Sequence, residues 1–423
     1  MKIKVKDAKY TDLINQKKVK HKKPKNPSWF LRKLILLLNK KELKEVQFSA
    51  IKSNVDKIDK KEPCLILMNH SSFIDLKIAF KLLSPRRFNI VCTDDGFVGK
   101  EWLLRHLGCI PTSKFITDVN LVKDMLYAKN KLHNSILMYP EASYSFDGTS
   151  TPLPTSIGKC IKLLDMPVIV IKTSGAFLRD PLYNNLQLRE VKISAKLDVI
   201  LSRDEIKNKK AEEIQEIIVK NFAFDNFKDQ QDNKIEVNEP FRADYLNRVL
   251  YKCPNCLKEG MMEGKGIYIT CNNCNAKYEL TKYGYLKAVN CKEIFNHIPS
   301  WYKWERECVK DEILSNSYNE EIKVAIFILL DYKRIYKVGE GILKHSISGF
   351  ELIGPDGLHY FQKPIDTYSL YSDFYWYEIG DVVCIGIFKM RYYCVPLDRK
   401  DIVAKLRLAT EEIYKITKNS KNG

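Results

Sequence analysis

Two Cys-x2-Cys pairs constrain the fold of this chain more than any other feature of its sequence. Cys253 and Cys256 form the first pair, Cys271 and Cys274 form the second, and fourteen residues separate them. Each pair places two thiolates in one tight turn, and a hairpin between the turns can close a tetrahedral zinc site. The other eight of the 12 cysteines stand singly, so a disulfide framework is not expected. The pattern predicts a structural zinc (Zn) ribbon over residues 246–290 in a reducing, cytoplasmic compartment.

The chain is strongly basic, with a formal net charge of +18. Residues 1–25 alone hold ten lysines against two aspartates. Such a surplus calls for an anionic counterpart, which can be nucleic acid, anionic lipid or an acidic carrier. The apolar stretch from Trp29 to Leu38 that follows is too short to cross a bilayer. Residues 1–45 therefore predict either a basic arm with an amphipathic membrane-surface helix or a core helix with a solvated tail.

Short apolar runs alternate with stretches of helical periodicity between Glu62 and Leu201. The strand-like runs are Cys64 to Met68, Phe88 to Cys92, Ile136 to Tyr139, Val168 to Ile171 and Val191 to Leu201. The helical stretches are Asp75 to Leu83, Lys100 to Leu107, Leu121 to Leu132 and Gly158 to Leu164. This alternation predicts an α/β domain with a mixed, largely parallel sheet over residues 46–224.

The remainder of the chain differs from this domain in composition and in the pattern of apolar residues. Residues 225–245 are polar and predict a linker, and residues 291–320 predict a helical connector after the ribbon. Residues 321–423 carry short runs rich in Val, Ile, Tyr and Phe, followed by an amphipathic helix from Asp401 to Ile416. These features predict a C-terminal β-rich domain with a closing helix, which is either pleckstrin-homology-like or a plain interaction domain.

His70 and Asp75 stand where a predicted strand ends and a helix begins, in the stretch Met68-Asn69-His70-Ser71-Ser72-Phe73-Ile74-Asp75. Ligands commonly bind at such strand ends in α/β sheets. The carboxylate can accept a hydrogen bond from one ring nitrogen and leave the other as a base, and Ser71 or Ser72 can cap the helix. Taken alone, the spacing fits a buried histidine beside a helix-capping aspartate better than a catalytic pair.

Three further stretches change that interpretation. After the block that holds His70, a second block from about Gly96 ends in Pro111-Thr112-Ser113-Lys114. Tyr139-Pro140-Glu141-Ala142-Ser143-Tyr144-Ser145 then ends a strand-like run, and Met166-Pro167-Val168-Ile169-Val170 forms a further strand. In this order they resemble the glycerolipid (lysophosphatidic acid-type) acyltransferase family. That family has an Asn-His-x4-Asp block, a block ending in arginine, a Phe-Pro-Glu-Gly-Thr/Ser-Arg-Ser block and a Val-Pro-Val-Val-Pro strand. The resemblance covers about residues 60–205.

The resemblance implies an enzyme that moves a fatty acyl group from a thioester to a hydroxyl of a lysophospholipid or related lipid. His70 would be the general base and Asp75 its support. Acyl-CoA or acyl carrier protein would be the co-substrate that donates the acyl group. The residues implied in substrate binding are Asn69, Lys114, Glu141 and Ser143.

Several positions depart from the family pattern. Ala142 and Tyr144 stand where the family has glycine and arginine, and Lys114 stands where it has arginine. Those arginines are expected to hold the phosphate of the acceptor. Arginine offers a planar two-pronged donor, whereas lysine is a point charge and tyrosine has only a hydroxyl. The hypothesis is that catalysis is retained while acceptor recognition has changed.

Two functions follow from the sequence. The favoured one is a peripheral acyltransferase on the inner face of the membrane, whose partners are the lipid surface, a lipid acceptor and, as one choice of donor, acyl carrier protein. Nucleic acid is not expected as a partner, and the ribbon is interpreted as a scaffold or protein-contact module. The alternative is a non-enzymatic protein on a degenerate acyltransferase domain, acting as a nucleic-acid-binding protein or membrane adaptor.

Overall fold

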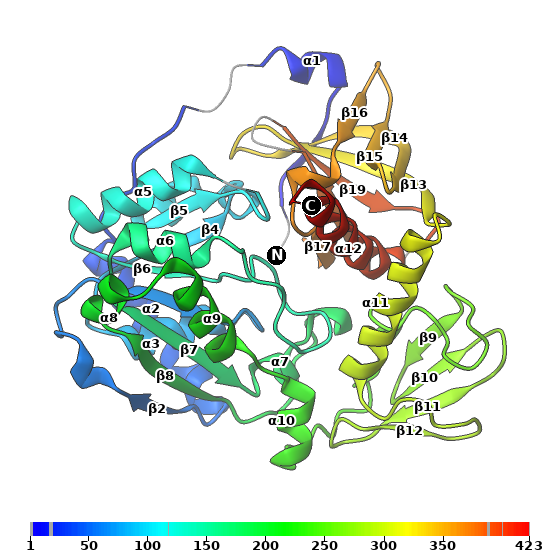
Figure 1. Ribbon diagram of the computed structural model, residues 1–423, viewed down its shortest axis with the longest axis horizontal. Coiled ribbons are helices and arrows are strands. Elements are labelled where there is room, and N and C mark those ends of the chain that lie inside the picture. Colours follow the sequence, from blue (N-terminus) through cyan, green and yellow to red (C-terminus); the bar gives the residue numbers. More distant parts are fainter. Residues whose placement is uncertain (1–2, 17–19, 117, 387–389, 400, 423) are drawn as a thin grey trace.

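The computed structural model describes residues 3–16, 20–116, 118–386, 390–399 and 401–422 (Figure 1). Three β-sheets organise these described residues: a seven-stranded sheet, a four-stranded sheet and an eight-stranded sheet. In Figure 1 the seven-stranded sheet lies at the left, the eight-stranded sheet at the upper right and the four-stranded sheet at the lower right.

The seven-stranded sheet has the order β2-β8-β7-β3-β6-β4-β5. Its neighbouring strands are parallel except for β7 and β8, which are antiparallel. The predicted mixed, largely parallel sheet is therefore confirmed. The strands are β2 (Ser49–Ser53), β3 (Leu65–Met68), β4 (Phe88–Thr93), β5 (Cys109–Thr112), β6 (Ser135–Met138), β7 (Val168–Ser174) and β8 (Ser194–Leu201).

Helices cover both faces of this sheet, which explains why β3 is apolar throughout. Ile66 and Met68 face a core shared with α2 (Trp29–Glu45) and α3 (Asp75–Leu83). Leu65 and Leu67 face the opposite core. That second core contains residues of α5 (Val119–Asn130), α6 (Ile157–Leu164), α8 (Arg203–Asn208) and α9 (Ala211–Phe222). Short helices α4 (Glu101–His106) and α7 (Ala176–Arg179) complete this part of the chain.

The prediction of a linker over residues 225–245 is wrong in part. Helix α10 (Asn226–Asp232) lies within it, and Phe227 and Gln230 on this helix are buried. The Phe227 ring lies 5.6 Å from that of Phe177. The acidic residues around Phe227 made the segment look like a solvated loop, although one face of it packs.

The four-stranded sheet is the predicted ribbon region. Its strands are antiparallel in the order β12-β11-β10-β9. They are β9 (Met262–Lys265), β10 (Tyr268–Cys271), β11 (Lys277–Leu280) and β12 (Leu286–Ala288). Helix α11 (Ile298–Leu314) then leads from this sheet to the C-terminal one.

The C-terminal sheet has the order β16-β15-β14-β13-β19-β18-β17, and α12 (Ile402–Asn422) closes it. Its strands are β13 (Asn319–Leu329), β14 (Ile335–Ser346), β15 (Gly349–Ile353), β16 (His359–Gln362), β17 (Tyr371–Trp376), β18 (Gly380–Ile385) and β19 (Arg391–Pro396). The predicted β-rich domain with a closing helix is present. Its pleckstrin-homology-like character stays a prediction.

The N-terminal residues belong in part to this C-terminal sheet, which differs from the free basic arm expected for residues 1–45. Strand β1 (Val5–Asp7) pairs in parallel with β14, with Val5 opposite Ile335. The following helix, α1 (Tyr10–Ile14), buries Leu13 in the core of the C-terminal half. The alternation of lysine with apolar residues in this segment is that of an edge strand.

Candidate active site

The candidate site lies at the carboxyl edge of the seven-stranded sheet. Strands β3, β6, β4 and β5 are adjacent and parallel, so the turns that follow them meet at one edge. His70 follows β3, Glu141 follows β6, Asp94 follows β4 and Lys114 follows β5. The fold therefore brings together the blocks that carry the resemblance.

His70 and Asp75 meet as the sequence predicted. The distance from His70 Nδ1 to Asp75 Oδ2 is 3.4 Å, and Asp75 is fully buried. The same Oδ2 accepts hydrogen bonds from the backbone N–H groups of Ser71 at 2.7 Å and Ser72 at 2.9 Å. Helix α3 begins at Asp75 itself, and its N-cap, Ile74, makes no side-chain cap bond, so the predicted serine cap is wrong. The aspartate thus fixes the turn and orients the imidazole.

Two tyrosines enclose the His70 ring. The ring centroids of Tyr139 and Tyr144 lie 4.2 Å and 4.0 Å from that of His70, and both are stacked on it. The His70 side chain keeps 23% of its surface exposed. Desolvation lowers the pKa of His70, Asp75 opposes this shift, and Lys114 adds to it. A neutral imidazole with a proton on Nδ1 would leave Nε2 free as a base.

Glu141 is a structural anchor for the turn that carries His70. Its Oε2 accepts a hydrogen bond from the His70 backbone N–H at 3.0 Å, and its Oε1 accepts one from Thr151 N–H at 2.8 Å. The residue has no exposed surface, and burial raises the pKa of Glu141 to about 7. These contacts hold two loops together, and the implied place of Glu141 in the lining of the acceptor site stays a prediction.

Asn69 and Ser143 are buried as well. Asn69 Oδ1 accepts a hydrogen bond from Thr173 N–H at 2.9 Å, and its amide donates to Ser71 Oγ at 2.9 Å. The Ser143 hydroxyl donates to the backbone oxygen of Tyr144 at 3.3 Å. Since Asn69 is 0% and Ser143 1% exposed, both side chains contact protein atoms in this structure, and their predicted contact with substrate stays a prediction.

Ala142 shows why the family has glycine at this place. Its backbone φ is 56°, in the left-handed region that favours glycine. The chain therefore keeps the turn after β6 with a residue that costs roughly 1–2 kcal/mol in that conformation.

Lys114 is half-buried and contacts the C-terminal sheet. Its Nζ lies 3.8 Å from the centroid of the Tyr371 ring. Burial lowers the pKa of Lys114, while Asp95 and Asp373 oppose the shift. Residues of β17 thus lie close to the position where the family has arginine, which sequence reasoning missed. No local signal could have revealed them, because Tyr371 stands 276 residues from its hydrogen-bond partner Asp95.

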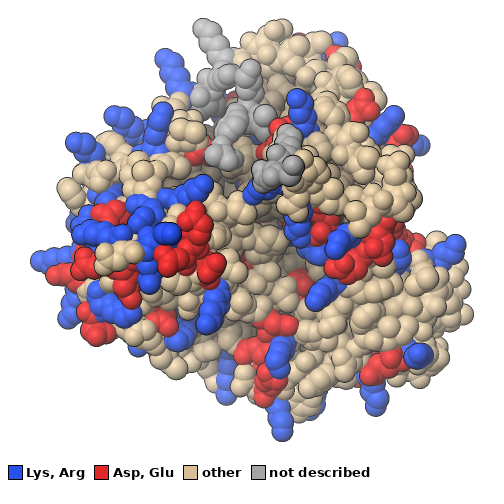
Figure 2. All heavy atoms as spheres, viewed as in Figure 1, with Lys and Arg blue, Asp and Glu red and all other residues tan. Residues whose placement is uncertain are grey.

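One cleft lies next to the loop that follows Glu141, and its lining does not include His70. It has a volume of about 610 Å³ and is lined by residues between positions 146 and 153, the end of α9, the start of α11 and the middle of α12. Figure 2 shows the face hollowed between the two halves of the molecule, with Lys and Arg side chains interspersed with Asp and Glu at the left, over the part that holds the seven-stranded sheet. The second cleft, about 390 Å³, lies beside β2 and β8 and also excludes His70.

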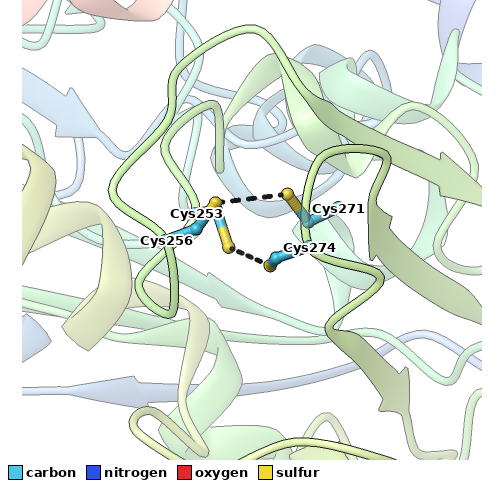
Figure 3. Close-up of side chains that lie close together, drawn as sticks. All are labelled: Cys253, Cys256, Cys271 and Cys274. Carbon is cyan, nitrogen blue, oxygen red and sulfur yellow. Dashed lines mark hydrogen bonds between the residues drawn. The ribbon is translucent and has the colours of Figure 1, made fainter.

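The four cysteines of the ribbon converge as predicted (Figure 3). All four sulfurs lie within 4.8 Å of one another. The sulfurs of Cys253 and Cys274 are 3.7 Å apart, as are those of Cys256 and Cys271. Four thiolates bound tetrahedrally at about 2.3 Å from one zinc ion would be about 3.8 Å apart, so the cluster fits a metal site.

Within the described residues, no helix is both long enough and apolar enough to cross a bilayer. No curated protein matches the chain in sequence. Four chains of solved structures match; one is the 1-acyl-sn-glycerophosphate (LPA) acyltransferase PlsC from Thermotoga maritima, with a TM-score of 0.37 and 15% sequence identity, over 46% of this chain and 77% of that one. Residues 50–173 match the family model described as Acyltransferase. This segment, which contains His70, Asp75, Lys114 and Glu141, is therefore a domain of the acyltransferase family.

Proposed function

We propose that the chain is a peripheral O-acyltransferase that moves a fatty acyl group from acyl-CoA or acyl carrier protein to a hydroxyl of a lipid. The observation that carries the proposal is the His70–Asp75 pair at 3.4 Å, at the carboxyl edge of the sheet and inside the matched segment. One ring nitrogen of His70 faces Asp75, and the His70 side chain is 23% exposed, which supports access of a substrate hydroxyl to it.

In the proposed reaction, His70 Nε2 takes the proton of the acceptor hydroxyl as that oxygen attacks the thioester carbonyl carbon. The new C–O bond forms, the C–S bond breaks, and the imidazolium returns its proton to the leaving thiolate. Asp75 stabilises the imidazolium because its carboxylate lies against Nδ1 in a fully buried position. Glu141 keeps the His70 backbone in place throughout.

Helix α2 supports the membrane part of the proposal. Trp29, Phe30, Leu37 and Leu38 are between 62% and 69% exposed on this helix. Exposed lysines accompany them at positions 33, 40, 41 and 44. An exposed apolar surface bordered by cations fits an anionic bilayer such as the inner face of a cell membrane. The proposed location is therefore cytoplasmic and peripheral.

A zinc ion is proposed at the four cysteines. Their thiolates and their spacing suit zinc better than Mg²⁺ or Ca²⁺, which prefer oxygen ligands. Its role would be structural, because four protein ligands leave no open position for a substrate.

The experiment is acyl transfer from a radiolabelled thioester to a lipid extract, with purified protein on anionic and on neutral vesicles. His70→Ala is expected to lower the rate roughly 100- to 10,000-fold, because the reaction loses its base. The matched control is His133→Asn, on an exposed histidine whose φ of 53° asparagine tolerates. Equal rates for His70→Ala and the unchanged protein would rule out the mechanism. Equal rates on both kinds of vesicle would rule out recognition of anionic lipid.

A further inference from the structure

The turn that carries His70 has a second buried support besides Asp75. The Ser72 hydroxyl donates a hydrogen bond to Asp180 Oδ1 and accepts one from the Ile74 backbone N–H at 3.2 Å. The Ser72 N–H is at the same time one of the two donors that hold Asp75 Oδ2, at a distance of 2.9 Å. Ser72 therefore connects Asp180 to the carboxylate that faces His70.

Asp180 lies outside the blocks that carry the family resemblance. It directly follows helix α7 and stands 108 residues from Ser72 in the sequence. Ser72 is 1% and Asp180 2% exposed, so their hydrogen bond lies in a low-dielectric interior where its loss is costly. Burial raises the pKa of Asp180 to about 7, but both forms of a carboxyl group offer an oxygen that accepts the serine hydroxyl. The contact therefore does not depend on the charge of Asp180.

Arg179 extends the connection from Asp180 to helix α2. Its Nη1 lies 3.3 Å from Asp180 Oδ2, and its Nη2 donates to Glu42 Oε1 at 2.8 Å. The guanidinium is planar and contacts both carboxyl groups, so it holds them in one geometry. Arg179 is itself buried, as are Asp180 and Ser72.

Glu42 connects helix α2 to the helix that begins at Asp75 as well. Its Oε2 forms an ion pair with Lys77 Nζ on α3. Glu42 stands about one turn after Leu38, which is 66% exposed on the apolar surface of α2 that is proposed to meet the membrane. A continuous set of contacts, Glu42 to Arg179 to Asp180 to Ser72, therefore leads from this helix to the turn of His70.

We propose that Asp180 and Arg179 are positioning residues for acyl transfer, which connect the turn of Ser72 to helix α2. Through Ser72 they keep the Asp75 carboxylate aimed at His70. The proposal rests on the proposed acyltransferase function. Neither residue touches the substrate or moves a proton. A shift of Ser72 would displace a donor to Asp75 and thereby turn the imidazole, and reaction rates are highly sensitive to such misplacement.

The test measures kcat and the KM for the acyl donor, with a lipid extract as acceptor on phosphatidylglycerol vesicles. The donor is radiolabelled palmitoyl-CoA or palmitoyl acyl carrier protein, whichever the unchanged protein uses. Asp180→Ala removes the acceptor of the Ser72 hydroxyl and should lower kcat roughly 10- to 100-fold, while KM stays within about twofold. Asp180→Asn keeps an oxygen acceptor and should recover most of that loss.

Two further variants follow the same contacts. Ser72→Ala removes the other partner of the hydrogen bond and should also lower kcat. Combined with Asp180→Ala, it should cost no more than the more impaired single variant, because both changes remove one contact. Arg179→Met should lower kcat by a smaller factor, since Ser72 keeps its acceptor while the connection to Glu42 is lost.

The matched control is Asp124→Ala, which removes an equally buried carboxyl group on α5, where Asp124 contacts the His21 ring. It should lower Tm without lowering kcat. A loss of kcat in Asp180→Ala no greater than in this control would overturn the inference, as would losses that add in full in the double variant. A raised KM with unchanged kcat would overturn it too.

If Asp180→Ala fails to fold, Ser72→Ala and Arg179→Met decide, and full kcat in both would sink the inference while the acyltransferase stands. Absence of His70-dependent transfer by the unchanged protein would instead overturn the proposed function.

Discussion

The imidazole of His70 lies between two tyrosine rings, and this packing sets the charge of the base. Burial disfavours the imidazolium, and Lys114 disfavours it further, while Asp75 favours it. The net effect places the pKa of His70 below its ordinary value of 6.5. Tyr144 thereby acquires a role different from that of the family's arginine, because it packs on the base and on Phe73, at a ring distance of 5.6 Å from the latter.

The first prediction concerns the pH dependence of the reaction. Because the neutral form of His70 is the active one and its pKa is lowered, the acid limb of kcat/KM should be centred below pH 6.5. Asp75→Asn removes the group that favours the imidazolium, so the residual activity should decline at a still lower pH. Steady-state profiles between pH 5 and 8 measure both. An acid limb centred above pH 6.5 would contradict the assignment of His70 as base.

The residues found from the sequence are those whose partners are close in the chain. His70 and Asp75 belong to one strand–turn–helix unit, so their spacing already predicted their contact. Tyr371 could not be found this way, because its contact with Lys114 depends on how two sheets pack. Sequence reasoning also implied substrate contact for Asn69, although the structure buries it completely.

Helices and strands were predicted best where the pattern of apolar residues was continuous along the whole element. The predicted bounds of β3 and α3 match the structure closely. A strand that is buried on both faces is apolar at every position, whereas a helix that is buried on one face is apolar at helical spacing, so the two patterns differ clearly. Helix α10 was missed because its few buried residues lie among acids. Strand β1 was missed because it is only three residues long and forms by pairing with β14, which is distant in the sequence.

The most specific prediction at this scale concerns the metal content of the zinc ribbon. The purified protein should contain about one zinc ion per chain, and Cys256→Ser should lose it together with several degrees of Tm. The ribbon contacts both neighbours. Arg248 Nη1 donates to the backbone oxygen of Tyr183 at 3.0 Å on one side, and Glu259 lies 2.8 Å from Lys405 Nζ on the other. Loss of zinc should therefore weaken the whole molecule.

Elemental analysis and calorimetry measure the two effects. Cys291→Ser is the matched control, because Cys291 lies next to the ribbon and outside the cluster of four. Retention of zinc by Cys256→Ser, or a Tm equal to that of the control, would contradict a four-thiolate site.

The whole molecule is joined by buried charges that no single segment of sequence could predict. Lys405 on α12 is 5% exposed, and its Nζ lies 2.8 Å from Glu259 of the ribbon, 2.8 Å from Glu312 of α11 and 2.9 Å from Glu320 of β13. One ammonium thus compensates carboxylates from three elements. The cluster joins the ribbon, α11 and the C-terminal sheet, and that sheet also packs against Val98 and Phe115 of the acyltransferase domain.

Lys405→Met should destabilise the protein by roughly 1.5–3 kcal/mol at pH 7, because it removes the buried cation that Glu259, Glu312 and Glu320 share. Lys252 remains beside Glu259 and Glu312, and Arg399 remains beside Glu320. The pKa of Glu259 is lowered, with Lys405 and Lys252 outweighing desolvation, so this stabilisation is present above the carboxylate's ordinary pKa of 4.5 and is lost as pH falls. The difference between the variant and the unchanged protein should therefore shrink below about pH 4.5. Urea unfolding at several pH values measures it, with Lys344→Met, at an exposed ion pair with Glu321, as the control. A deficit that is no larger than that of the control, or that grows in acid, would show that these charges do not hold the three parts together.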